Sequence, residues 1–235
     1  MTAVHSTEAP PVDSFLARER PVVVSAAAVL LRAYVAIAAT ATAAGIVLVH
    51  TAAFAPVVRW DHRVSVWFVH HRTPAWNRTS DVFTWVANTS GIVAVAVVVT
   101  SFLLWRRWGR RAWLPVLGLG LELSCFLTVN YLVRRPRPTV PRVGHAPSTF
   151  SFPSGHCSAT LVLYGGLAVL VAMATRRLWP RVAAWAVAVF LTLGVATSRV
   201  YRGEHHLLDV VAGVSIGVAA LAAAVIATHR MERVP

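Results

Sequence analysis

The segment LLDVVAGVSIGVAALAAAVIAT, residues 207–228, carries a single charged side chain, Asp209, in an otherwise apolar run. A helix that crosses a bilayer needs roughly 20 consecutive, mostly apolar residues, so this segment is long enough to span a membrane. Similar runs precede it at about Val22–Val49, Gly91–Trp105, Ala112–Val133, His156–Thr175 and Val182–Ser198. The pattern predicts an all-α, polytopic membrane protein with six transmembrane helices in one bundle.

The overall composition agrees with a bilayer as the solvent. Of 235 residues, 57% are hydrophobic and 13% are charged, and the mean hydropathy is +0.62. These values exclude a water-soluble globule, a disordered chain, a collagen and a coiled coil, each of which needs a different balance of charge, glycine or heptads. We expect one membrane domain over residues 22–228, a flexible cytoplasmic tail at 1–21 and a second cytoplasmic tail at 229–235.

The basic residues are all arginine and give a formal net charge of +13. They form short clusters between apolar runs and no continuous basic face, which argues against nucleic acid as a partner. The two cysteines, Cys125 and Cys157, match neither a disulfide framework nor a zinc pattern. The arginine-for-lysine and Ala/Val bias is typical of a GC-rich bacterium.

Residues 60–89 differ from the apolar runs around them. This stretch is polar and contains the tryptophans Trp60, Trp67, Trp76 and Trp85. Tryptophan is enriched where a membrane meets water, so the stretch is predicted to be an interfacial segment. The span that begins near Gly91 is short alone and can be extended back through residues 82–88, which leaves its start open.

Arginine clusters in two short loops predict the orientation. The loops after the second and fourth spans carry Arg106, Arg107, Arg110, Arg111, Arg176, Arg177 and Arg181. Cytoplasmic loops carry an excess of such residues, so these loops are predicted to be cytoplasmic. With six spans, the third-to-fourth and fifth-to-sixth loops then open together on the opposite, non-cytoplasmic face. Arginines cluster there too, which indicates that they have another task.

Three short segments meet at that face: Arg134–Pro138 (RRPRP), Pro153–His156 (PSGH), and Ser198-Arg199 followed by His205 and Asp209. Each alone has an ordinary explanation, as a proline-stiffened loop, a helix cap or a surface ion pair. Together they are the groups that a phosphoryl-transfer site requires.

The arginines and the helix start can hold the phosphoryl group. Arg137 and Arg199 can stabilise negative charge on its oxygens. Ser154 and Gly155 open a helix whose free N–H groups and positive dipole end form an anion site.

The histidines can carry the chemistry. His205 and Asp209 are four residues apart, so the carboxylate can orient the imidazole and leave its other nitrogen to attack phosphorus, forming a phosphohistidine. His156 can protonate the departing oxygen and then activate water. We expect no metal and no cofactor, since only Glu204 and Asp209 offer carboxylates there.

The ordered motifs resemble those of the type 2 phosphatidic acid phosphatase superfamily of membrane lipid phosphatases, KxxxxxxRP, PSGH and SRxxxxxHxxxD. The resemblance implies that His205 is the nucleophile, Asp209 its partner and His156 the general acid. It implies that phosphate is bound by Arg137, Arg199, Ser154 and Gly155. The first motif departs from the family pattern, because Asn130 stands where the family has lysine. Asn130 is therefore expected to be a weaker phosphate contact, supplemented by Arg134 or Arg135.

The sequence predicts an integral protein of the bacterial inner or plasma membrane that removes a terminal phosphate from a lipid at the non-cytoplasmic face. Polyprenyl diphosphate and phosphatidylglycerol phosphate are the candidate substrates, and membrane lipids are the other expected partners. Two alternatives stay open: a lipid phosphotransferase that uses the same site, and a catalytically silent lipid-phosphate binder. Glu122, inside the third span, is equally consistent with function and with packing. The oligomeric state is not predicted.

Overall fold

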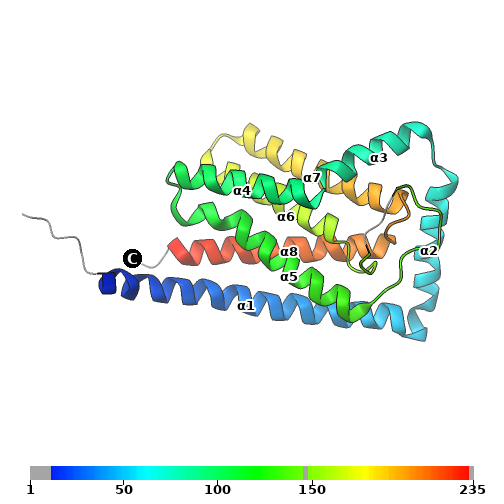
Figure 1. Cartoon of the computed structure of the whole chain (residues 1–235), viewed down its shortest axis with the longest axis horizontal. Coiled ribbons are helices and arrows are strands. Elements are labelled where there is room, and N and C mark those ends of the chain that lie inside the picture. The colour runs from blue at the N-terminus through cyan, green and yellow to red at the C-terminus, as the bar shows by residue number, and fades with distance from the viewer. Residues whose placement is uncertain (1–11, 145–147, 233–235) are drawn as a thin grey trace, which may run out of the picture.

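The computed structural model describes residues 12–144 and 148–232 and is all-helical over these ranges (Figure 1). The chain forms the α-helices α1 (Val12–His50), α2 (Ala55–His70), α3 (Pro74–Val86), α4 (Thr89–Trp105), α5 (Leu114–Val133), α6 (Gly155–Ala174), α7 (Leu178–Tyr201) and α8 (Leu207–Glu232). Two 3-10 turns, Ala52–Phe54 and Gly109–Trp113, precede α2 and α5. The all-α prediction is confirmed.

The described residues contain five or six candidate membrane spans. Helices α1, α5, α6, α7 and α8 are each long and apolar enough to span a bilayer. The sixth candidate is the pair α3 and α4, which passes the same test only jointly and bends by 44° at a short break. The span that starts near Gly91 is therefore completed by residues as far back as Pro74, which the sequence placed in the interfacial segment.

The ends of the chain also differ from the expected boundaries. Helix α1 already begins at Val12, and α8 continues to Glu232, so residues 12–21 and 229–232 of the two predicted tails are helical. Residues 1–11 and 233–235 lie outside the described part of the chain.

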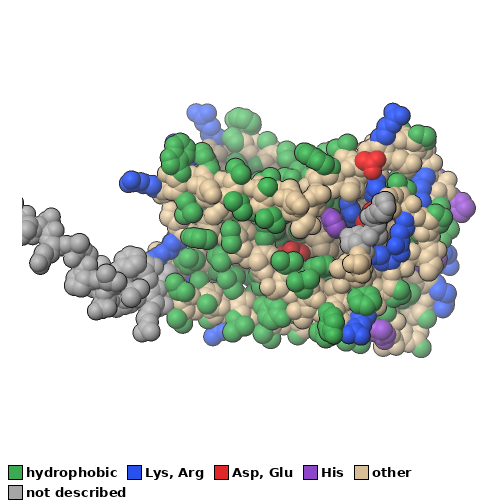
Figure 2. Space-filling model, in the orientation of Figure 1, with side chains coloured by type: hydrophobic (Ala, Val, Ile, Leu, Met, Phe, Trp, Pro, Cys, Tyr) green, Lys and Arg blue, Asp and Glu red, His purple; other side chains and the backbone are tan. Residues whose placement is uncertain are grey.

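Helix α2 lies across one end of the bundle, roughly perpendicular to the spanning helices (Figure 1). Its tryptophans Trp60 and Trp67 are exposed, as are Trp76 and Trp85 on α3. Figure 2 shows hydrophobic side chains spread along the bundle and arginines gathered toward its two ends. This distribution fits an apolar belt in lipid with an aromatic, polar cap at the α2 end.

Close packing of α8 against α6 places the site at that capped end. α8 packs against α1, α5 and α6. A Cβ added at Gly213 would clash with the carbonyl oxygen of Ser154, and one at Gly217 would lie 2.9 Å from the carbonyl oxygen of Ser158. The two glycines therefore let the first turns of α6 and α8 approach at backbone contact, which brings the PSGH motif beside Asp209.

Candidate active site

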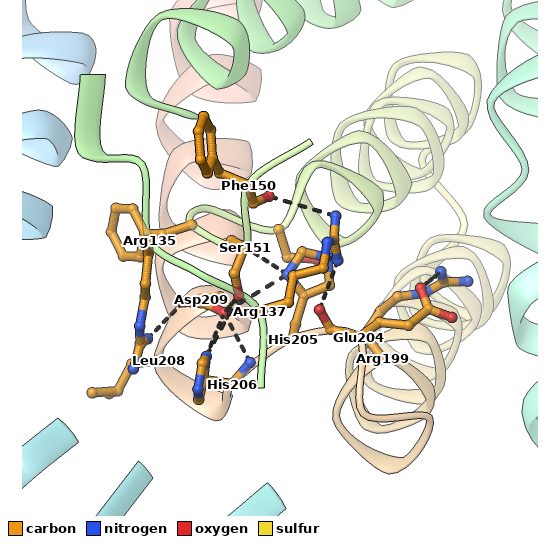
Figure 3. Close-up of polar contacts among 12 residues, drawn as sticks. Arg135, Arg137, Phe150, Ser151, Arg199, Glu204, His205, His206, Leu208 and Asp209 are labelled. Atoms are coloured by element: carbon orange, nitrogen blue, oxygen red, sulfur yellow. Dashed lines mark hydrogen bonds and ion pairs between the residues drawn. The ribbon is translucent and has the colours of Figure 1, made fainter. Parts of the chain in front are cut away.

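His205 lies in the short connection between α7 and α8 and is 2% exposed. Its Nδ1 atom is 2.7 Å from the carbonyl oxygen of Ser151. A carbonyl only accepts, so Nδ1 carries the proton and donates it, which leaves a lone pair on Nε2 of the neutral ring. That Nε2 atom is 3.5 Å from Nη1 of Arg137. The ring is thus fixed in the tautomer that a nitrogen nucleophile needs (Figure 3).

The expected direct bond between His205 and Asp209 is replaced by a relay through Ser151. Asp209 Oδ2 is 3.8 Å from His205 Nδ1, beyond hydrogen-bond distance. The same carboxylate oxygen accepts bonds from the Ser151 hydroxyl and from the backbone N–H of His206 at 2.8 Å. Asp209 therefore holds Ser151, and the Ser151 carbonyl holds His205. A spacing of four residues indicated the pair but could not show that a loop residue lies between them.

Burial sets the charge state of His205. Removal from water lowers the pKa of His205 below its ordinary value, and the positive charge of Arg137 acts in the same direction. The negative charge of Asp209 raises this pKa, as does the hydrogen bond to the Ser151 carbonyl. The net lowering keeps the imidazole neutral near pH 7, the form that can attack phosphorus.

Arg135, which the sequence predicted to contact phosphate, lies in a buried ion-pair triad. Its Nη1 is 2.6 Å from Asp209 Oδ1 and its Nη2 is 2.8 Å from Asp61 Oδ2. The Arg135 side chain is 2% exposed, and both carboxylates are fully buried. Asp61, on α2, also accepts the backbone N–H of Leu208 at 3.1 Å. Sequence reasoning missed Asp61 because a single acid in an interfacial stretch carries no distinguishing signal.

Asn130, which the sequence predicted to be a weak phosphate contact, anchors the backbone of a loop. Its Nδ2 donates to the carbonyl oxygens of Phe150 and Phe152, each at 2.9 Å. Its Oδ1 accepts the N–H of Phe150 at 3.2 Å. The amide is thus engaged on both sides of Ser151. A lysine could donate to these carbonyls but could not accept the N–H, so asparagine suits this loop.

Arg199 is buried with two nitrogen atoms unused. It is 2% exposed, and its Nη1 pairs with Glu204 Oε2 at 2.5 Å. Its Nε and Nη2 atoms are buried and find no hydrogen-bond partner among the described residues. A buried guanidinium donor without a partner is costly, and a phosphate oxygen would satisfy it. Glu204, one of the two carboxylates that the sequence placed near the site, orients this arginine.

Arg137 is aimed by backbone carbonyls. Its Nη1 donates to the Glu204 carbonyl at 2.6 Å and its Nε to the Thr149 carbonyl at 3.0 Å. These bonds hold the guanidinium beside the His205 ring, where an anion attacked by Nε2 would be bound.

The start of α6 forms another wall of the site. Ser154 is the N-cap and is fully buried. Its N–H donates to the Asp209 carbonyl at 2.9 Å, and its hydroxyl contacts Cys157 Sγ at 3.2 Å. Both donors are thus used inside the protein, which differs from the predicted phosphate contact. Gly155 and His156, the next two residues, line the cavity beside His205.

That cavity has a volume of about 260 Å³ and two contrasting regions. The catalytic candidates Arg137, Gly155, His156 and His205 line it. Apolar side chains from α4, α5 and α6 line it as well, namely Ile92, Val93, Leu119, Leu123, Phe126 and Ala159. A charged head group attached to a hydrocarbon chain matches both regions.

The sequence model of the PAP2 superfamily matches residues 111–233, more than half of the chain. The chain belongs to the PAP2 superfamily. Among its relatives, YbjG of Escherichia coli, provisionally named an undecaprenyl-diphosphatase, is 28% identical over 60% of this chain and 73% of its own. Phosphatidylglycerophosphatase B of Bacillus subtilis is 27% identical over 67% of this chain and 78% of its own.

Two solved structures share the fold. The transmembrane PAP2 type phosphatidylglycerolphosphate phosphatase of Bacillus subtilis superposes with a TM-score of 0.69 at 24% identity, covering 88% of this chain and 96% of that protein. LpxE of Aquifex aeolicus superposes with a TM-score of 0.53 at 17% identity, covering 70% and 92%. The PAP2 bundle is therefore the architecture that positions the residues described above.

Proposed function

We propose that this PAP2 superfamily member is a membrane lipid phosphatase that removes the terminal phosphate of a lipid phosphate or diphosphate through a phosphohistidine at His205. One observation carries the proposal. The lone-pair nitrogen of His205 lies 3.5 Å from a guanidinium of Arg137, in a cavity also lined by His156 and by apolar side chains. The cavity thus combines a nucleophile, an anion-binding arginine, a proton donor and an apolar surface that can contact a lipid chain.

The reaction follows from this arrangement. The Nε2 lone pair of His205 attacks phosphorus, and the bond from phosphorus to the lipid oxygen breaks as His156 gives that oxygen a proton. Arg137 and Arg199 hold the oxygens of the transferring group, together with the first N–H groups of α6. In the second step His156 takes a proton from water as the water oxygen attacks phosphorus. The P–N bond breaks, and inorganic phosphate leaves.

The substrate class rests on the apolar cavity wall and on the relatives. One relative is provisionally named for undecaprenyl diphosphate and another for phosphatidylglycerophosphate. Polyprenyl diphosphate and phosphatidylglycerol phosphate are therefore the substrates to test first.

The site is proposed to face the non-cytoplasmic side of the cell membrane. The connections from α4 to α5 and from α6 to α7 lie at the bundle end opposite α2 (Figure 1). They carry the arginine clusters Arg106, Arg107, Arg110, Arg111, Arg176 and Arg177, which favours a cytoplasmic location for that end. An impermeant maleimide should label Thr139→Cys in intact cells and Arg176→Cys only after permeabilisation. The reverse pattern would invert the orientation.

Phosphate release by detergent-purified protein tests the function. The panel is a polyprenyl diphosphate, phosphatidylglycerol phosphate and phosphatidic acid, each with EDTA present. We expect release by the wild type, loss of at least about a thousandfold in His205→Ala, and no change in His229→Ala, whose ring lies half-exposed near Glu232. Transfer of phosphate to an added lipid acceptor in place of release would identify a phosphotransferase. Lipid binding with neither reaction would identify a silent binder.

A further inference from the structure

Glu122 is an acidic group that the proposed reaction does not use, yet it lines the same cavity as His156 and His205. It lies on α5 within a membrane-spanning segment and is 3% exposed. A carboxyl group at such a depth is costly unless it has partners. Its Oε1 atom accepts a hydrogen bond from the Ser158 hydroxyl. The rest of the carboxyl group faces the cavity.

The position of Glu122 along the cavity is fixed by Ser158. Ser158 lies three residues after Gly155, the first residue of α6. Ser158 is thus about one helical turn, roughly 5.4 Å, from the start of α6 that faces the phosphate. Because Glu122 is hydrogen-bonded to Ser158, it lies at about the same depth. Around it, the described cavity wall is apolar, with Leu119, Leu123 and Phe126 from α5 and Ala159 from α6.

We propose that Glu122 binds a hydroxyl group of the substrate located about one helical turn from the phosphorus atom. A carboxyl oxygen accepts such a hydrogen bond, and the apolar surroundings strengthen it. A glycerol phosphate with a free hydroxyl on the second carbon carries that group four bonds from phosphorus, a reach comparable with one turn.

This inference rests on the proposed function and specifies its substrate class. Phosphatidylglycerol phosphate carries the required hydroxyl. A polyprenyl diphosphate has no hydroxyl at that depth, where its second phosphate and then its hydrocarbon chain would lie. The Glu122 carboxyl would meet negative charge from the phosphate, or its oxygen would find no hydrogen-bond donor on the hydrocarbon. Glu122 therefore selects a glycerol phosphate head group over a polyprenyl diphosphate.

A matched pair of substrates tests the inference. The pair is phosphatidylglycerol phosphate and phosphatidylpropanediol phosphate, which lacks only the head-group hydroxyl, and the readout is the ratio of their kcat/KM values. The wild type is expected to prefer the hydroxyl lipid by about tenfold or more. Glu122→Gln, whose amide oxygen still accepts, is expected to keep most of this preference. Glu122→Leu is expected to bring the ratio to about one.

Leu123→Ala is the control, because it enlarges the same cavity without removing a polar group and should lower both rates while keeping their ratio. A wild-type ratio near one, or an unchanged ratio in folded Glu122→Leu, would overturn the role of Glu122 and leave the phosphatase proposal intact. Absence of hydrolysis of any lipid by folded wild type would overturn both.

Discussion

Ser151 connects two residues that the chemistry needs. Its carbonyl accepts from His205 at 2.7 Å, and its hydroxyl donates to Asp209. Asn130 fixes the backbone on both sides of it through Phe150 and Phe152. The direction of the His205 ring is therefore set by a loop that the Asn130 amide helps to hold, together with the bond from the Ser151 N–H to the Arg135 carbonyl.

Replacing Asn130 should slow turnover more than it weakens lipid binding. In Asn130→Ala the Ser151 carbonyl is free to shift, and a displacement of about 1 Å near the reacting atoms can cost roughly a hundredfold. We expect kcat to fall by tenfold to about a hundredfold with KM nearly unchanged, measured by steady-state phosphate release. Ser124→Ala, exposed on the same helix, is the control. A rise in KM with kcat preserved would instead identify Asn130 as a substrate contact.

The lowered pKa of His205 makes a prediction about pH. Its ordinary value is 6.5, and burial lowers it. The neutral, nucleophilic ring then persists below pH 6.5, and activity is lost only as the pH falls through the lowered value. The acid limb of kcat/KM for the free enzyme is therefore expected below pH 6.5. A limb centred above that value would mean that His205 is charged more easily than its burial allows.

At the residue level, the predicted site residues differ in the contacts that the structure gives them. Spacing and helix-start chemistry indicated His156, His205, Arg137 and Arg199. The first three line one cavity, and Arg199 pairs with Glu204, the residue before His205. It gives Asn130, Arg135 and Ser154 internal hydrogen bonds or ion pairs in place of a phosphate contact. The hydrogen bonds of these side chains depend on how residues 134–144 and 148–154 fold back on the helices, and this folding has no periodic signature in the sequence.

At the scale of the elements, a buried ion pair connects α2 to the site. Asp61 on α2 shares Arg135 with Asp209 of α8, and all three side chains are buried. A buried guanidinium that loses one carboxylate partner keeps its desolvation cost. The triad therefore couples the cap of the bundle to the helix that follows His205.

Asp61→Asn should destabilise the fold by on the order of 3 kcal/mol, because Arg135 stays buried with one partner neutral. Asp81→Asn is the matched control: Asp81 also pairs with an arginine, Arg202, but its side chain is 63% exposed, so a change below about 1 kcal/mol is expected. Thermal unfolding in detergent compares the two variants. Equal shifts in Tm would show that the buried triad contributes no more to stability than the exposed ion pair of Asp81.

The contact between α6 and α8 gives a second prediction at this scale. A methyl group in Gly213→Ala meets the backbone carbonyl of Ser154, which cannot rotate away. We expect a lower Tm and a kcat/KM reduced by about tenfold, because the start of α6 is displaced. Gly120→Ala, with nothing within 4 Å of the added Cβ, should keep activity and should not lower Tm. Retained activity in Gly213→Ala would show that the two helices tolerate separation.

At the scale of the whole molecule, hydropathy predicted the bundle because bilayer thickness dictates the length of each apolar run. It could not predict that α3 joins α4, with a 44° bend between them, to form a sixth candidate span, since the polar residues of α3 look interfacial. Nor could it show that α2 caps the bundle through Asp61. Both features depend on contacts between distant segments, which a local window of sequence does not contain.

The most direct test of the central claim is to trap the phosphorylated enzyme. Wild-type protein is mixed with lipid labelled in its terminal phosphate, quenched in alkali during turnover, and digested for mass spectrometry. The account predicts a base-stable, acid-labile phosphate on the peptide that contains His205, absent from His205→Ala. Full turnover with no phosphate on His205, or with phosphate on another residue, would contradict it.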